Sequence, residues 1–232
     1  MPSANYSKTA KVYASLGIRD SFYLAYRDLP KLFQKYVCGM HALDYGCGAG
    51  KSTRYLRSKG FDVRGIDTNA AMLKEARKED PLGTYDLTSS TKLLQEKFDL
   101  IFCASVFEEI ATRKELVRIL KEMYSLLKKD GKIIVITGTP DAYFNNWSSF
   151  IGKLPGNKVV SGSIVRVQIR GTDLILRDHL WLDTDHHAAF KKAGLRVLST
   201  SKPLAKRNDP FRWYSEKKKP IWVVYVLGRA VD

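Results

Sequence analysis

The residues best suited to bind a ligand lie in the segment 43–50, which reads Leu-Asp-Tyr-Gly-Cys-Gly-Ala-Gly. Here a short apolar strand is expected to end, the chain to turn through glycines, and a helix to begin at Lys51. Glycine permits a sharp turn and leaves no Cβ between the backbone and a ligand. At the C-terminal edge of a parallel sheet, such a turn is where nucleotide-like ligands bind. The segment therefore predicts a ligand site at Gly46 and Gly48.

Two carboxylates narrow the choice of ligand. Asp67 ends the second expected strand about 20 residues after the first glycine, the spacing of an acid that accepts hydrogen bonds from ribose hydroxyls. Asp44 directly precedes the turn, where it would repel a pyrophosphate and attract an ammonium or sulfonium group. The dinucleotide fingerprint G-x-G-x-x-G would also need glycine at position 51, where the chain has lysine. S-adenosylmethionine has a ribose and a cationic tail but no phosphate, so these residues favour it as the ligand. The alternative is that the glycines serve only a tight turn.

These residues resemble the first motif of the class I S-adenosylmethionine-dependent methyltransferases, and the similarity extends over residues 40–140 and more loosely to the end of the chain. The resemblance implies S-adenosylmethionine as cofactor and S-adenosylhomocysteine as product. It implies that the glycine turn, with Cys47, lies under the methionine part of the cofactor. Asp44 would help to hold the amino group, and Asp67 would grip the ribose.

The resemblance also assigns roles to three later segments. Thr68 and Met72 would lie beside the adenosine. Asp86 and Leu87 would contact the adenine. The end of the fourth expected strand would line the pocket near the sulfonium, through the consecutive residues Cys103, Ala104 and Ser105.

Both ends of the chain add to the resemblance. Tyr6-x3-Ala10-x2-Tyr13 is similar to a tyrosine pattern in small-molecule members, whose N-terminal helices fold over the cofactor. Tyr6 and Tyr13 are therefore predicted to contact it; the alternative is that these two residues, one heptad apart, pack on the core. Residues 178–181, Asp-His-Leu-Trp, are loosely similar to bacterial small-molecule methyltransferases.

Strand and helix patterns alternate through the first part of the chain. Residues 112–127 give the clearest helix, with apolar residues recurring on one face. The strands are apolar enough to be buried on both faces, as in a parallel sheet covered by helices. Short links imply right-handed βαβ units. The expected strands are 42–45, 61–66, a short one near 85–86, 98–104 and 132–137, and the other expected helices are 51–58 and 69–78.

The pattern changes after Thr137, where residues 139–162 are expected to form an aromatic loop. Asp183 is expected to cap a helix that ends at Gly194. The later elements expected are a hairpin of 163–169 and 173–177 that turns at 170–172, a helix from 183 to 193, and strands at 195–200 and 221–227.

The whole pattern predicts an α/β fold. We expect a Rossmann-like, seven-stranded, mostly parallel sheet with helices on both faces, an N-terminal helical cap and a β-hairpin inserted after strand five. A chain of 232 residues suits one substantial core and is short for two full domains. A single domain, 1–232, is expected to comprise a cap at 1–40, a cofactor-binding core at 41–138, a substrate-enclosing insertion at 139–180, and a C-terminal helix with closing strands at 181–232.

Methyl transfer from a sulfonium is an in-line displacement that needs an oriented nucleophile and exclusion of water. A hydroxyl or ammonium acceptor must also lose a proton. His179 and His186 are candidate bases for oxygen methylation, although most histidines are not catalytic. A metal site is not expected, because the nearby acids suit the first turn of a helix. Candidate acceptor contacts are Phe107, Tyr143, Trp147 and Trp181, unless these aromatics only close a satellite core under a long loop.

Composition leaves the class of acceptor open. The net charge is +15, but the positive residues are scattered, which favours a solvated basic surface over a nucleic-acid docking surface. The Pro-Cys dipeptide of cytosine-C5 methylases and the [Asn/Asp/Ser]-Pro-Pro-aromatic motif of nucleic-acid amine methylases are absent. The leading prediction is an enzyme that methylates an O or N atom of a small molecule. The alternatives are an RNA or protein methyltransferase that docks through its basic surface, and a non-catalytic binding module.

Cysteine usage and hydropathy predict a cytoplasmic protein. The three cysteines show no metal-ligand spacing and suit reduced thiols better than disulfides. No apolar run approaches the roughly 18 residues of a membrane span, and the first eight residues lack the apolar core of a secretory signal. The sequence does not indicate the oligomeric state.

Overall fold

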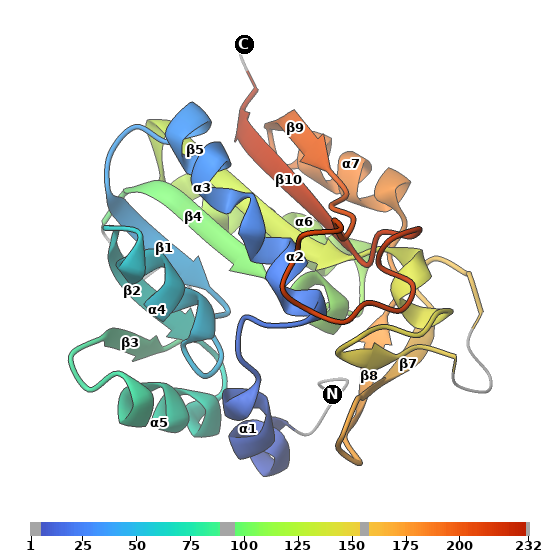
Figure 1. Cartoon of the computed structure of the whole chain (residues 1–232). Helices are drawn as coiled ribbons and strands as arrows, with labels where there is room; N and C mark the ends of the chain where they lie inside the picture. The colour runs from blue at the N-terminus through green and yellow to red at the C-terminus, as the bar shows by residue number, and fades with distance from the viewer. Residues whose placement is uncertain (1–5, 89–95, 154–157, 231–232) are drawn as a thin grey trace.

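The computed structural model describes residues 6–88, 96–153 and 158–230, and its centre is a seven-stranded sheet (Figure 1). The strand order is β3-β2-β1-β4-β5-β10-β9, and β10 runs antiparallel to both of its neighbours. This confirms the predicted Rossmann-like, mostly parallel sheet. The strands are β1 (His41–Tyr45), β2 (Asp62–Asp67), β3 (Thr84–Leu87), β4 (Phe98–Ala104), β5 (Leu127–Gly138), β9 (Leu195–Ser201) and β10 (Trp222–Arg229).

Two layers of helices bury the two faces of the sheet, as predicted. On one face α2 (Ser21–Arg27), α3 (Leu29–Tyr36) and α4 (Lys51–Ser58) pack on the strands through a core that includes Leu29, Leu56 and Phe102. On the other face the apolar stripe of α6 (Arg113–Leu126) and residues of α7 (Asp183–Lys192) form a second core. Because β4 alternates, Phe102 faces the first core and Cys103 the second.

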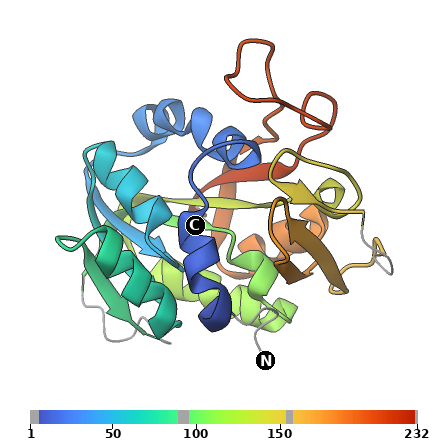
Figure 2. The same ribbon diagram turned by 60° about the horizontal axis from the view of Figure 1, so that its bottom comes forward.

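The predicted N-terminal helical cap is confirmed, and its described part comprises three short helices. The first, α1 (Tyr6–Ser15), lies across the C-terminal ends of the parallel strands, which Figure 2 shows from below. Its Ala10 packs against Ala49, in the glycine turn after β1, and Met72 of α5 (Ala70–Glu79). Ala10 is small enough to let α1 approach the turn closely.

The insertion after β5 forms a second, three-stranded antiparallel sheet. The predicted hairpin is confirmed as β7 (Ile164–Ile169) and β8 (Ile175–His179). The expected aromatic loop is more ordered than predicted, because it contains a 3-10 helix, η3 (Pro140–Tyr143), and a short strand, β6 (Phe150–Ile151), that pairs with β7. The ring nitrogen of Trp147 donates to the Ala142 carbonyl over 2.8 Å and ties the loop to η3.

Two expected boundaries are wrong. β5 begins at Leu127 rather than at 132, because residue 127 already pairs with Phe98 beyond a register shift. The N-cap of α7 is Leu182 rather than Asp183, and the Asp185 carboxylate accepts the Leu182 backbone N–H over 3.0 Å. Asp183 instead accepts a hydrogen bond from the Tyr225 hydroxyl at 2.9 Å, which anchors α7 to β10.

Candidate functional site

A cavity of about 820 Å³ opens at the C-terminal edge of the parallel strands. Its volume lies within the ~300–1,000 Å³ typical of small-molecule sites. Residues that follow β1, β2 and β4 line it, and α1, α2 and the start of α4 contribute further walls. A smaller cavity of about 40 Å³ adjoins it, and the two share Tyr13, Phe22, Ser105, Glu109 and Trp222. After the ligands that the sequence predicts, we call them the cofactor cavity and the acceptor cavity.

The glycine turn forms the floor of the cofactor cavity. Gly46, Gly48 and Gly50 have φ angles of 74°, 54° and 77°, in the left-handed region that glycine enters without steric cost. A Cβ on Gly46 would collide with Val106, whereas a Cβ on Gly48 would meet no atom within 4 Å. The space beside Gly48 is therefore open to a ligand, as the sequence predicts.

Asp67 reaches the same cavity from the end of β2. Its two carboxylate oxygens accept the backbone N–H groups of Gly48 and Asn69, each at 2.8 Å. These bonds fix the carboxylate, and each oxygen keeps one further acceptor position for a ribose hydroxyl. Burial raises the pKa of Asp67, and the backbone bonds oppose that effect.

Asp44 lies deeper than the sequence suggests and does not line the cofactor cavity. One of its oxygens accepts the hydroxyls of Ser52 and Thr53 at 2.7 and 2.6 Å. The other, Oδ1, is buried with no hydrogen-bond partner among the described residues. Burial raises the pKa of Asp44 to about 6. An orphaned carboxylate oxygen under the turn suits a cationic ligand group above it.

Of the four residues predicted to contact the adenosine, two line the cofactor cavity and two do not. Thr68 and Met72 line the cofactor cavity. Asp86 does not, because its carboxylate forms an ion pair with Arg64 at 3.3 Å. Leu87 is 57% exposed and also lies outside the lining, which this part of the chain reaches one residue later at Thr88.

The predicted contacts in α1 and at the end of β4 also include residues that line a cavity and residues that do not. Tyr13 lines both cavities, whereas the side chain of Tyr6 lies outside the described part of the chain. Ala104 and Ser105 line the cofactor cavity, but Cys103 is fully buried in the core on the opposite face of the sheet. Ser105 has a φ of 57°, a strained conformation that ends β4 where the two cavities meet.

The structure adds Lys51, the first residue of α4, to the cofactor cavity. Its ammonium lies 3.7 Å from the centroid of the Phe22 ring. Burial lowers the pKa of Lys51 to about 8, and the charge of Arg54 adds to the effect. In the sequence alone, this lysine serves only to exclude a dinucleotide site. Its position directly after the glycine turn was a signal that it faces the same ligand.

Two buried acids that the sequence analysis did not select line the acceptor cavity. Glu108, after β4, accepts the backbone N–H of Gly138 at 2.6 Å through Oε1. Asp178, on β8, accepts the hydroxyl of Tyr143 at 3.1 Å. Burial raises the pKa of both carboxyls, and the neighbouring charges of Glu108 and Glu109 raise that of Asp178 further.

Of the four aromatic residues predicted to contact the acceptor, Tyr143 lines the acceptor cavity. Phe107, Trp147 and Trp181 line neither cavity and are buried in the cores. The ring nitrogen of Trp181 donates to the Ile110 carbonyl at 3.0 Å. These residues were predicted as acceptor contacts because each has a large aromatic side chain near a long loop. A side chain of this kind can equally well pack in the core.

The two candidate histidine bases do not reach either cavity. His186 is buried among the rings of Phe107, Phe190 and Tyr225, and burial lowers its pKa to about 4. His179 ends β8 beside Asp178 but is itself outside the lining. Neither imidazole is therefore placed to accept a proton from an acceptor in the cavity.

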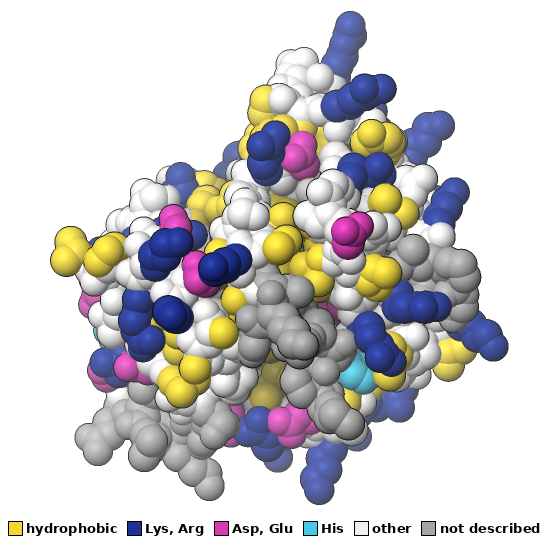
Figure 3. All heavy atoms as spheres, turned by 90° about the horizontal axis from the view of Figure 1, so that it is seen from below, with side chains coloured by type: hydrophobic (Ala, Val, Ile, Leu, Met, Phe, Trp, Pro, Cys, Tyr) yellow, Lys and Arg dark blue, Asp and Glu magenta, His cyan; other side chains and the backbone are white. Residues whose placement is uncertain are grey.

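Other features bear on the alternatives. The described residues contain no group of three or more His, Cys, Asp or Glu side chains that could hold a metal ion. No helix among them is long and apolar enough to cross a membrane. On the face seen in Figure 3, Lys and Arg side chains project at many places and hydrophobic side chains lie between them.

Comparisons with known proteins agree with the cofactor motif. Residues 43–135 match the family model described as a methyltransferase domain. Glycine/sarcosine N-methyltransferase from Aphanothece halophytica is 34% identical over 101 residues, 40% of this chain and 38% of that protein. Malonyl-[acyl-carrier protein] O-methyltransferase from Enterobacter lignolyticus is 29% identical over 102 residues, 43% of this chain and 39% of that protein. The chain thus spans about two fifths of the length of these curated relatives.

Solved structures match over nearly the whole chain. An S-adenosylmethionine-dependent methyltransferase from Clostridium acetobutylicum superimposes with a TM-score of 0.66 and 17% identity, covering 98% of this chain and all of that one. DesVI from Streptomyces venezuelae gives 0.65 and 18%, covering 96% and 98%. At such identities the likeness concerns the fold. The fold is thus one that S-adenosylmethionine-dependent methyltransferases also have, and residues 43–135 match a methyltransferase domain.

Proposed function

We propose that this protein transfers the methyl group of S-adenosylmethionine to a small molecule bound in the acceptor cavity. The observation that carries the proposal is the junction of the two cavities at Tyr13 and Ser105. One cavity is floored by the glycine turn and Asp67. The other is enclosed by α2, the insertion and the start of β10. A donor and an acceptor bound on either side of this junction would meet there.

Most of the residues that would hold the cofactor line its cavity, and Asp44 lies beneath the glycine turn. Asp67 would accept the ribose hydroxyls, and the open side of Gly48 would leave room for the backbone to touch the ligand. Asp44, through its orphaned oxygen, and Lys51, through its ammonium, offer opposite charges to the amino and carboxylate groups of an amino acid. The bound cofactor supplies an activated methyl group on a sulfonium. The protein orients the acceptor and excludes water.

A small acceptor is favoured over a nucleic acid by the character of the acceptor cavity. Its two buried carboxylates would repel a phosphate backbone, and its aromatic and aliphatic walls enclose little space. The basic outer surface then needs no partner, and acts as a solvated surface.

The test is calorimetric titration of the full chain with S-adenosylmethionine and S-adenosylhomocysteine, with NAD as the control. We expect micromolar binding of the first two and none of NAD. Mass spectrometry would then follow transfer of a labelled methyl group to a panel of small molecules. Failure of both sulfur compounds to bind would refute the proposal and favour a binding module that keeps only the fold.

A further inference from the structure

We infer that the acceptor is an amine, bound as its ammonium ion between the carboxylates of Glu108 and Asp178 and methylated at nitrogen. This inference rests on the proposed function and adds the chemical class of the substrate. Neither the family nor the cofactor motif determines this class, because the named relatives include both N- and O-methyltransferases.

The first observation is the incomplete pairing of Glu108. Its side chain is buried and lines the acceptor cavity, and Oε1 is held by the Gly138 backbone N–H. Oε2 has no hydrogen-bond partner among the described residues. Leaving one oxygen of a buried carboxylate without a donor is costly, and a ligand that donates hydrogen bonds would remove the cost. An ammonium does so with three N–H donors and a positive charge.

The second observation is that a second acid faces the same space. A Cβ on Gly138 would lie 3.5 Å from both Glu108 Oε1 and the Tyr143 hydroxyl oxygen. These two groups therefore lie close together beside Gly138, which has no side chain to separate them. The Tyr143 hydroxyl in turn donates to Asp178. No described Lys or Arg forms an ion pair with Glu108 or Asp178. Two buried acids without a cation are complementary to a cationic ligand.

The other residues that line the acceptor cavity indicate the chemical character of the rest of the ligand. Apart from Ser105 and Glu109 they are apolar or aromatic, and Phe22 and Trp222 border both cavities. A carboxylate acceptor would be repelled by the two acids. The other apolar lining residues are Ala142, Phe150, Val167, Leu176 and Ile221, which suit a hydrocarbon skeleton.

The same two acids can accept the proton that the ammonium must lose before methylation. The ammonium gives one proton to a carboxylate of Glu108 or Asp178, which exposes the nitrogen lone pair. The lone pair then forms the C–N bond as the methyl–sulfur bond breaks, and the bonding electrons stay on sulfur. The products are a methylated ammonium ion, S-adenosylhomocysteine and the proton on the carboxyl, which later passes to water. Burial and the neighbouring Glu109 raise the pKa of both carboxyls, which makes either one a better proton acceptor once it is ionised.

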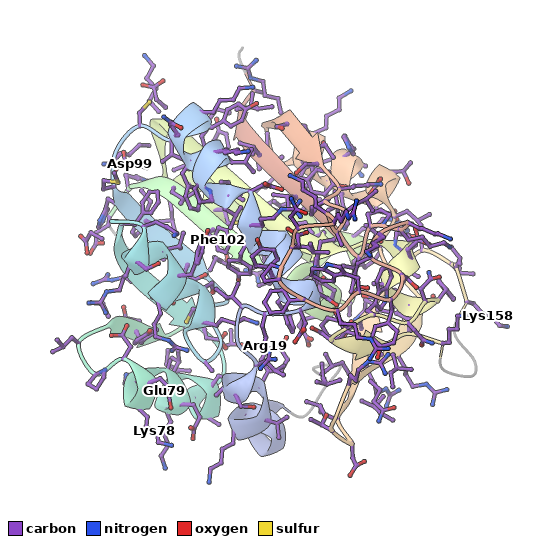
Figure 4. The ribbon with its side chains drawn as sticks, in the orientation of Figure 1. Arg19, Lys78, Glu79, Asp99, Phe102 and Lys158 are labelled. Atoms are coloured by element: carbon purple, nitrogen blue, oxygen red, sulfur yellow. The ribbon has the colours of Figure 1, made fainter. Side chains whose placement is uncertain are left out.

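The experiment compares small amines with alcohols of the same carbon skeleton, such as methylamine with methanol and ethylamine with ethanol, because the acceptor cavity is small. Each is titrated into the full chain saturated with S-adenosylhomocysteine. We expect amines to bind roughly 10- to 100-fold more tightly than their alcohols, as for hydrogen bonds to charged groups. Glu108→Gln and Asp178→Asn should each remove most of this preference. Glu79→Gln, an exposed acid at the end of α5 and distant from the insertion (Figure 4), should keep it.

Two further readouts separate the possible failures. Calorimetry in buffers of different ionisation enthalpy should show a proton released when an amine binds to the wild type and less in the variants. S-adenosylhomocysteine should bind all four proteins equally, which shows that the variants are folded. Normal binding of that compound with no amine preference in any pair would overturn this inference and leave the proposed function standing. Loss of its binding in the wild type would overturn both.

Discussion

The cofactor cavity and the acceptor cavity adjoin, but the chain builds them in different ways. The largest share of the cofactor side comes from two short segments, the turn at 46–52 and residues 66–72, at the ends of neighbouring parallel strands. The acceptor side is assembled from α1, α2, the end of β4, the insertion and the start of β10. Its two acids are 70 residues apart in the sequence. A local sequence motif can therefore determine which methyl donor binds, while substitutions elsewhere in the chain alter the acceptor site independently.

The largest effect is expected from filling the floor of the cofactor cavity. Gly48→Asn should weaken S-adenosylhomocysteine binding by at least ~100-fold, because the side chain would occupy the open space beside the turn. Asparagine tolerates a positive φ, so the fold should survive. Gly60→Asn is the matched control, since Gly60 also has a positive φ and no atom within 4 Å, but is exposed outside the cavity. Calorimetry on both variants measures the difference, and normal binding by Gly48→Asn would refute the placement of the ligand.

A second prediction uses the stability of the unliganded protein. The folded-state pKa of Asp44, about 6, is above the ~3.9 of an unfolded aspartate, so folding favours the protonated form. This stabilising contribution is complete below pH ~4 and is lost as the pH rises through 6. Asp44→Asn should therefore be more stable than the wild type at pH 7 by up to about 3 kcal/mol, at ~1.4 kcal/mol per pKa unit.

Urea unfolding between pH 4 and pH 7 measures this effect. The charged or hydrogen-bonding groups that face Asp44 are Ser52, Thr53, Asp67 and Tyr26, and none of them changes in the variant. Glu79→Gln should run parallel to the wild type over the whole range. Parallel curves for Asp44→Asn would mean that the Asp44 carboxyl is not perturbed. The variant should also bind the cofactor less tightly, since its orphaned oxygen loses its charge.

The third prediction compares two acids that the sequence assigned to the cofactor. Asp67→Asn should weaken S-adenosylhomocysteine binding by about 2 kcal/mol, because charge-assisted bonds to the ribose become neutral ones. Asp86→Asn should change it by less than ~0.5 kcal/mol, because the Asp86 carboxylate pairs with Arg64 outside the cavity. Equal losses in the two variants would show that residues near β3 do contact the adenine.

These two acids also show how far sequence reasoning extends. The sheet and the glycine turn follow from hydrophobic periodicity and local motifs, which are properties of short segments. Whether a side chain reaches the cavity depends on strand alternation, and this separates Cys103 from Ala104. Glu108 and Asp178 carried no motif, because only tertiary packing brings them together. His186 and Trp147 show the opposite case. Their residue types suggested that they belong to a site, but both side chains are buried in the core.

The smallest effect tests whether the two cavities are energetically independent. Tyr143→Phe removes the hydroxyl that donates to Asp178 but keeps the ring. We expect acceptor binding to weaken by about 1 kcal/mol, the typical net value of one hydrogen bond. S-adenosylhomocysteine affinity should stay within the error of the titration, because Tyr143 borders only the acceptor cavity. A parallel loss of both affinities would show that the insertion also shapes the cofactor side. A loss confined to the acceptor would mean that substitutions in the insertion can alter the substrate without disturbing the methyl donor.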